Sequence, residues 1–133
     1  MDPNTEVSDL VPRLGEAPFA QLVAGFYDRV RADDLLAPMY PENDWEGAEE
    51  RLREFLIGRC GGAQRYIEKR GHPRLRMRHA PYELTPAARD RWMELMGASL
   101  DDCLAAGQFP EAEAGVLRAF LDHTATFLIN RPG

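Results

Sequence analysis

A short basic segment holds the side chains of this chain that are best suited to bind a ligand. It lies between Pro73 and Pro81, and it contains Arg74, Arg76, Arg78 and His79. The chain as a whole carries a formal net charge of -6, so this local excess of guanidinium groups indicates an anionic partner. Because imidazole is a common metal ligand, the histidine at the end of the segment predicts that the partner contains a metal.

His79 would have to be the only strong protein ligand of such a metal. No second histidine or cysteine lies at the spacing of a zinc site, and Pro73 separates His72 from any helical face shared with His79. One protein ligand is enough when another chelator already holds the metal, as porphyrin holds the iron of haem. Haem also brings two propionates, which guanidinium groups bind through charge-assisted hydrogen bonds. On spacing alone, a hydrogen-bonded histidine beside solvated arginines stays open as the more ordinary interpretation.

Length and composition predict one globular domain, and the lack of signal-peptide and membrane-span patterns predicts that it works in the cytoplasm. The chain has 133 residues, of which 44% are hydrophobic and 29% are charged, values typical of a folded domain. The acidic balance argues against a nucleic-acid partner. The N-terminus lacks the pattern of a signal peptide, and no apolar segment approaches the ~20 residues of a membrane span, so we expect no stable membrane insertion. Cys60 and Cys103 are expected to be reduced structural thiols.

Hydrophobic periodicity favours an all-α fold, because apolar residues recur at helical spacing and alternate nowhere at strand spacing. We expect helices over residues 17–31 and 46–59, from the Thr85-Pro86 pair to Gly107, and from Pro110 to the residues before Pro132. Residues 63–84 form the only long interval without a helical stripe. Pro73 and Pro81 leave room there for at most one or two turns of helix.

The chain resembles the group II truncated haemoglobins from about residue 15 to residue 130. The segments that carry the resemblance are FYDRV, MYPEND, AEERLREFL, GHPRLRMRHAPYEL and RDRWMELM, in that order. The resemblance implies a globin-like two-over-two sandwich of α-helices that binds haem b. It also implies a division of the chain into an N-terminal extension, residues 1–14, and a truncated globin domain, residues 15–133.

The resemblance further implies a role for individual residues. His79 falls on the family's proximal histidine, which binds the haem iron. Tyr27, Tyr40 and Trp92 match its distal aromatic positions, where O–H and N–H donors stabilise the partial negative charge of bound dioxygen. Ala48 lies where many globins carry a distal histidine, and its methyl group cannot donate a hydrogen bond. The remaining expected contacts are Leu52, Phe55 and Leu56 on the distal side of the haem, and Arg51, Arg76 and Tyr66 at its propionates.

Two departures from the family pattern concern corners between helices. Cys60, Gly61, Gly62 and Ala63 stand where an aromatic residue followed by Gly-Gly-Pro is common in the family. A Gly-Gly pair near the N-terminus is reduced to Gly15. Because the histidine, the tyrosines and the tryptophan are all present, these departures leave the expectation of haem binding unchanged.

The leading functional hypothesis is a haem protein that reversibly binds dioxygen, and also CO and NO, at a five-coordinate iron. The alternative is a redox enzyme that uses the same pocket for NO dioxygenation or peroxidase chemistry, with a reductase as partner. A third class is a haem-free helical module whose basic segment contacts an acidic protein or RNA, but it gives the distal aromatic residues no shared role. The oligomeric state is expected to be a monomer or a homodimer.

Overall fold

The structure is a computed structural model that describes residues 6–132. In this range the chain is helical and contains no strand. Its long helices are α2 (Ala17–Arg31), α3 (Trp45–Arg59), α6 (Pro86–Ala105) and α7 (Glu111–Phe127). Its short helices are η1 (Val7–Asp9), α1 (Leu10–Leu14), η2 (Ala37–Met39), α4 (Arg65–Arg70) and α5 (Leu75–His79).

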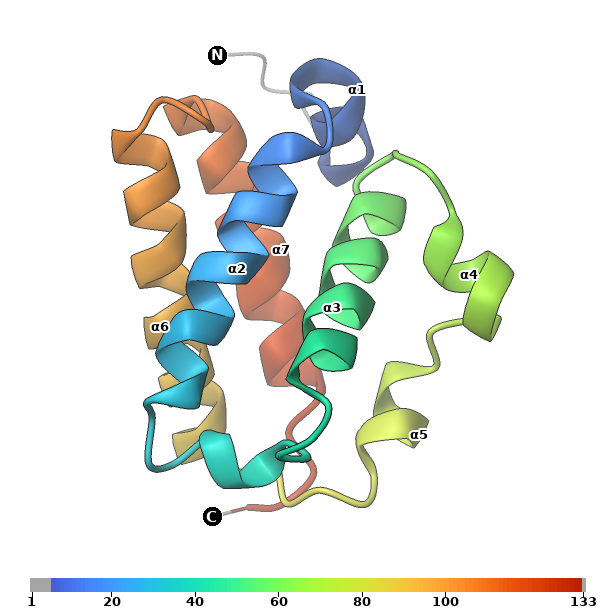
Figure 1. Ribbon diagram of the computed structural model, residues 1–133, viewed down its shortest axis with the longest axis vertical. Helices are drawn as coiled ribbons and strands as arrows, with labels where there is room; N and C mark the ends of the chain where they lie inside the picture. The colour runs from blue at the N-terminus through green and yellow to red at the C-terminus, as the bar shows by residue number, and fades with distance from the viewer. Residues whose placement is uncertain (1–5, 133) are drawn as a thin grey trace.

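The long helices form a sandwich in which the α2–α3 pair lies over the α6–α7 pair (Figure 1). Helix α2 packs on both α3 and α6, and α6 packs on α7. Helices α4 and α5 lie at the flank of the sandwich beyond α3, opposite the flank occupied by α6 (Figure 1). The predictions of an all-α protein and of a two-over-two sandwich are therefore confirmed.

Local signals in the sequence set the ends of these helices. Thr85 caps α6, because its Oγ1 accepts a hydrogen bond from the backbone N–H of Ala88 at 3.1 Å, and Pro86 follows in the first helical turn, where its missing N–H costs nothing. Beyond the end of α6, Gly107 has a φ of 79°, a left-handed conformation that glycine adopts without steric cost. The expected start and end of this helix are confirmed.

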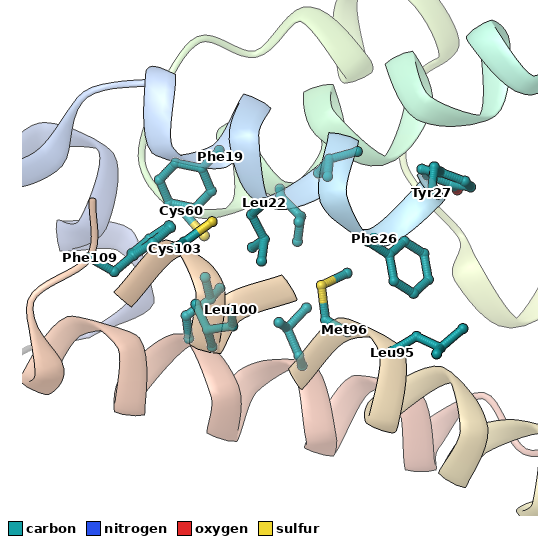
Figure 2. Close-up of a cluster of buried hydrophobic side chains, with 14 of the residues drawn as sticks. Phe19, Leu22, Phe26, Tyr27, Cys60, Leu95, Met96, Leu100, Cys103 and Phe109 are labelled. Atoms are coloured by element: carbon teal, nitrogen blue, oxygen red, sulfur yellow. The ribbon is translucent and has the colours of Figure 1, made fainter. Parts of the chain in front are cut away.

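The core lies where α2 crosses α6. Phe19, Leu22 and Phe26 of α2 are fully buried. Leu22 and Phe26 point toward α6, which carries Met96 and Leu100, and Phe19 packs against Phe109, with ring centroids 5.4 Å apart (Figure 2). This is the stripe that the period of 3.6 residues predicts for α2. The two cysteines, Cys60 and Cys103, are buried free thiols in the same cluster, and burial raises the pKa of the Cys60 thiol to about 12.

Close contact between the backbones of α2 and α6 depends on one small residue. A Cβ atom on Gly25 would lie 2.5 Å from Ser99 Oγ, so a larger residue would force either the Ser99 side chain or the helices to shift. The Ser99 hydroxyl is buried, and it donates a hydrogen bond to the carbonyl oxygen of Leu22 at 2.7 Å. Gly25 and Ser99 therefore fix how closely these two helices approach.

The segments outside the long helices agree with the sequence only in part. Helix α5 confirms the short helix expected between Pro73 and Pro81, whereas α4 and α1 were not expected. Residues 1–5 of the expected N-terminal extension lie outside the described residues. The described part packs on the sandwich, since Leu10 is fully buried and the Val11 N–H donates to the carbonyl oxygen of Cys60 at 2.9 Å. Within residues 6–132, no helix is both long and apolar enough to cross a membrane.

Candidate functional site

A cavity of about 490 Å³ opens beside α3 and extends to α5, α6 and α7. All the residues expected at the site line this cavity, with the exception of Arg76. They are Tyr27, Tyr40, Ala48, Arg51, Leu52, Phe55, Tyr66, His79 and Trp92, together with Leu56. Side chains that are far apart in the sequence are thus brought to one apolar chamber.

His79 is the last residue of α5, and its ring is partly buried at the cavity wall. Its Nδ1 lies 2.7 Å from the carbonyl oxygen of Leu75, one helical turn earlier. With Nδ1–H donating to this carbonyl, the neutral imidazole keeps its lone pair on Nε2. A carbonyl partner on the far nitrogen also orients a metal-binding histidine, so His79 is held in a form ready to bind a metal.

Asn130, just beyond α7, holds the segment that follows His79. Its Nδ2 donates to the carbonyl oxygens of His79 and Tyr82 at 3.2 and 3.0 Å. Its Oδ1 accepts the N–H of Leu84 at 3.0 Å, and its own N–H donates to the carbonyl oxygen of Leu84 at 2.9 Å. Sequence reasoning missed this residue, because no local pattern connects residue 130 with residues 79–84.

Three aromatic side chains form a hydrogen-bonded group at the cavity: Tyr27, Tyr40 and Trp92. The Tyr40 hydroxyl is hydrogen-bonded to the Tyr27 hydroxyl and to the Trp92 indole, whose N–H can only donate, and the two tyrosine rings lie 5.6 Å apart. Burial, the neighbouring Tyr40 and the hydrogen bond to it raise the pKa of Tyr27 far above its usual value. Burial also raises the pKa of Tyr40, despite the hydrogen bonds that it accepts. Both phenols are therefore neutral donors at physiological pH.

Trp45 supports this group, and sequence reasoning did not single it out. Its ring stacks on that of Tyr40, with centroids 5.5 Å apart and planes inclined by 29°. It is the first residue of α3. The only signal in the sequence was an aromatic residue at the start of a helix, which does not distinguish a core residue from a pocket residue.

The arginines of the basic segment take different places. Arg78 lines the cavity, and its guanidinium donates to the carbonyl oxygens of Pro73 and Arg70 at 2.7 and 2.8 Å. Arg76 does not line the cavity, and its guanidinium lies over the ring of Phe127, 5.3 Å from the centroid. The expected contact between Arg76 and a propionate therefore finds no counterpart at the cavity wall.

Two other arginines line the cavity. Arg51 does so as expected, and it forms an ion pair with Asp44 at 3.0 Å. Arg89 was not expected at the site, and its guanidinium pairs with Asp90 and Asp122. Further wall residues come from α7 and its C-cap, namely Phe120, Leu121, Thr124, Ala125 and Leu128. The helical period identified Phe120, Thr124 and Leu128 as an apolar stripe, but it could not tell that they face a cavity.

The chemistry of these donors fits haem. Within residues 6–132, no group of three or more His, Cys, Asp and Glu side chains could hold a metal ion by itself. The cavity instead offers one imidazole, apolar walls and guanidinium groups, which suits a flat apolar chelate that carries its own metal and two carboxylates. A helical sandwich around such a cavity, with one metal-binding imidazole and a group of aromatic donors, defines a globin.

Comparisons with known proteins agree with this class. The sequence model of the bacterial-like globins matches residues 13–126. The group 2 truncated hemoglobin YjbI of Bacillus subtilis is 35% identical over 118 residues, which make up 89% of this chain and 86% of the relative. This chain therefore belongs to the bacterial-like globin family and, within it, to the group II truncated haemoglobins. Membership implies that it binds haem and uses it to bind ligands.

Two solved structures show the same architecture. The thermostable hemoglobin of the actinobacterium Thermobifida fusca is 43% identical, with a TM-score of 0.86 over 97% of this chain and 100% of that chain. The truncated oxygen-avid haemoglobin of Bacillus subtilis is 33% identical, with a TM-score of 0.81 over 90% of this chain and 98% of that chain. The resemblance to group II truncated haemoglobins is thus confirmed in both sequence and fold.

Proposed function

We propose that this protein binds haem b through His79 and reversibly holds dioxygen, as well as CO and NO, on the side of Tyr27, Tyr40 and Trp92. The observation that carries the proposal is the presence of one oriented imidazole and three coupled aromatic donors in a single cavity. Once bound, haem supplies an iron atom whose open sixth position can take a diatomic molecule. The oxygen-avid Bacillus subtilis relative supports dioxygen as the ligand.

His79 is the proposed proximal ligand. Its hydrogen bond to the carbonyl oxygen of Leu75 fixes the ring orientation and leaves Nε2 to bind. Helix α5 ends at this residue, and Asn130 holds its carbonyl group. The imidazole therefore needs little rearrangement to meet a metal in the cavity.

Tyr40 is the proposed principal donor to the ligand. The Trp92 indole can only donate to the Tyr40 oxygen, and we propose that the Tyr27 hydroxyl donates to it as well, so that the proton of the Tyr40 hydroxyl stays available for the ligand. A hydroxyl that accepts two hydrogen bonds is polarised and donates more strongly. A hydrogen bond to a charged group contributes roughly 1.5–3 kcal/mol. Such a bond should slow the release of a partly negative ligand by about tenfold or more, compared with a pocket that lacks the donor. In this proposal Trp92 and Tyr27 act mainly by holding Tyr40.

The rim of the cavity supplies the proposed contacts to the propionates. Arg51 and Tyr66 keep the roles expected from the sequence, because both line the cavity. Arg78, which also lines it, takes the place of Arg76. Ala48 is buried at the cavity wall and offers only a methyl group, so we propose that its side of the pocket leaves a route for the ligand.

Reconstitution with hemin tests the proposal. The hemin-loaded protein, once reduced, is expected to show an intense porphyrin band that shifts on addition of CO or dioxygen. His79→Ala should remove the axial bond and change the spectrum of the reduced form, whereas His72→Ala, which alters an exposed histidine, should change nothing. A protein that ignores added hemin, or whose spectrum is insensitive to His79→Ala, would contradict the proposal.

A redox function is the alternative, in which the same pocket oxidises NO or uses peroxide. The observation that favours it is a groove on the surface that shares a wall with the cavity, because turnover needs a route for electrons. Sustained NO consumption with a protein reductase would support this alternative over simple binding. The cytoplasmic location and the monomeric or homodimeric state stay predictions.

A further inference from the structure

A second hollow, of about 770 Å³, lies on the flank formed by α3, α4 and α7 and extends to Leu75 of α5. Five residues line both this groove and the cavity: Phe55, Tyr66, Leu75, Phe120 and Thr124. The two hollows are therefore separated by a single layer of side chains. Anything that docks in the groove comes within one side chain of the proposed haem site.

Apolar side chains are exposed around this groove. Ile67 of α4 and Phe127 of α7 line it, and they are 41% and 53% exposed. Met77 of α5, next to the Arg76 that lies over Phe127, is 61% exposed. Exposed aromatic residues and methionine, interleaved with arginine, are typical of the centres of protein–protein interfaces.

Positive charge gathers on the same flank. Residues 65–78 hold six of the chain's sixteen lysines and arginines but only one of its twenty-two acidic residues. Arg65, Lys69 and Arg70 are paired with carboxylates of neighbouring helices. Arg74 and Arg76 are exposed, and no carboxylate in the part of the chain that the structure describes forms an ion pair with either. Among the described residues, the flank therefore offers two guanidinium groups without a carboxylate partner, beside exposed apolar side chains.

We infer that the groove lined by Ile67 and Phe127, together with Arg76 over Phe127 and the exposed Arg74 and Met77 of the adjoining segment, is the docking surface for an acidic electron-carrier protein. The inference rests on the proposed function, in which the haem iron must be ferrous to bind dioxygen. One electron leaves the reduced centre of the carrier and converts the ferric iron of bound haem to ferrous iron, with no change in bonds or protons. Carboxylates of the carrier would pair with Arg74 and Arg76, and an apolar side chain would enter the groove.

The distribution of charge favours a compact acidic protein over a broad polyanion. Outside residues 65–78 the chain has ten lysines and arginines and twenty-one acidic residues. An anionic bilayer or a nucleic acid extends beyond the basic flank and would meet this acidic remainder. A small protein with one acidic face meets only the flank.

Binding of a plant-type [2Fe–2S] ferredoxin, a small acidic one-electron carrier, tests the inference. The hemin-loaded protein is titrated with oxidised ferredoxin by calorimetry at low salt and again in 0.5 M salt, so that the readout is binding and not turnover. We expect saturable binding that weakens strongly in salt. The double variant Arg74→Gln/Arg76→Gln should weaken it by roughly tenfold, and Met77→Gln should weaken it further.

A matched control removes the same charge from the opposite flank. Arg29→Gln/Arg118→Gln disrupts the ion pairs with Asp102 and Asp101 on α6 and should leave ferredoxin affinity within about twofold of the wild type. Reduction by ferredoxin should slow in the Arg74→Gln/Arg76→Gln variant only, whereas reduction by dithionite should be equal in all variants.

The inference is overturned if ferredoxin does not bind, or if both double variants lose affinity equally. Binding to vesicles of anionic lipid without binding to ferredoxin would assign the flank to a membrane surface instead. Either result leaves the spectral test of haem and dioxygen binding untouched, so a failure here is distinguishable from a failure of the proposed function.

Discussion

The side-chain amide of Asn130 donates a hydrogen bond to the backbone carbonyl oxygen of His79 at 3.2 Å. The end of the chain thereby holds the residue proposed to bind the haem iron. The same side chain bonds to Tyr82 and Leu84, so it secures the whole connection from α5 to α6. Helix α5 itself contains no buried residue. The hydrogen bonds of Asn130 are therefore an important anchor for this connection.

Asn130→Ala is expected to loosen this connection. It removes three side-chain hydrogen bonds, which should lower the free energy of unfolding by about 2 kcal/mol. Hemin loss to an excess of a haem-scavenging globin should also accelerate, and the iron–histidine stretching band in resonance Raman spectra should broaden or shift. Asn43→Ala, which changes an exposed asparagine, should alter none of these, and an unchanged Raman band in Asn130→Ala would deny that residue a positioning role.

Tyr40→Phe is expected to accelerate dioxygen release by about tenfold or more, because it removes the proposed donor to the ligand. Tyr27→Phe should have a smaller effect, since Tyr27 acts through its hydrogen bond to Tyr40. In the double variant, Tyr27→Phe should add little to Tyr40→Phe. Stopped-flow release rates for the four proteins provide the measurement, and independent, additive effects would mean that each phenol contacts the ligand separately.

Dioxygen release should stay nearly constant through the pH range near 10, where an ordinary phenol is half ionised. The pKa values of Tyr27 and Tyr40 are raised, mainly by burial, so both stay protonated where free tyrosine loses its proton. The sign follows from linkage: these groups begin to destabilise the fold only above the pKa of the unfolded chain. The measurement is the release rate of Tyr40→Phe divided by that of the wild type. A decrease of this ratio as the pH rises to about 10 would show that Tyr40 ionises no later than an ordinary phenol.

Asp33 is expected to stabilise the protein at neutral pH and to lose this effect in acid. Burial alone would raise the pKa of its carboxyl group, but hydrogen bonds from the Leu36 N–H and the Arg91 guanidinium hold that pKa below the usual value. The stabilisation is therefore present above the ordinary pKa of about 3.9 and disappears as the pH falls through the lower pKa of the folded state. Urea midpoints should separate Asp33→Asn from the wild type at pH 7 and converge toward pH 3, while Asp34→Asn, at an exposed neighbour, stays close to the wild type throughout.

Gly25→Ala should destabilise the protein, although alanine is the better helix former by about 1 kcal/mol. The added Cβ would lie 2.5 Å from Ser99 Oγ, and relief of such a contact typically costs about 1–3 kcal/mol. Combining it with Ser99→Ala should recover part of the loss, because the Ser99 Cβ lies at an ordinary distance of 3.5 Å. The measurement is thermal unfolding of Gly25→Ala, Ser99→Ala and the double variant. A double variant no more stable than Gly25→Ala would place the conflict elsewhere.

Sequence patterns predicted the long helices well, because each buries a stripe that repeats over several turns. Helix α2 spans residues 17–31, as expected, and α3 begins one residue before the expected start. Helix α4 escaped prediction because it has six residues and buries only Tyr66, which is too short for a period to be recognised. Its stability comes from α3, where the buried Glu54 pairs with Lys69 and Arg70, and no local pattern reports such a contact.

The site was predictable to the extent that single residues carry a family motif. His79, Tyr27, Tyr40 and Trp92 were named from the sequence and line one cavity. The sequence could not predict whether Arg76 or Arg78 lines the cavity, because residues two apart on a helix point in nearly opposite directions. Only the fold decides which direction faces the cavity, and it places Arg78 there.

The absence of buried residues in α5 bears on how a bound porphyrin would be released. The core cluster between α2 and α6 contains no side chain of α5. We therefore expect that α5 can detach while the rest of the sandwich stays intact. Exchange of a bound porphyrin is then expected to require only local opening of this segment, against the hydrogen bonds of Asn130 and Arg78, and not unfolding of the whole sandwich.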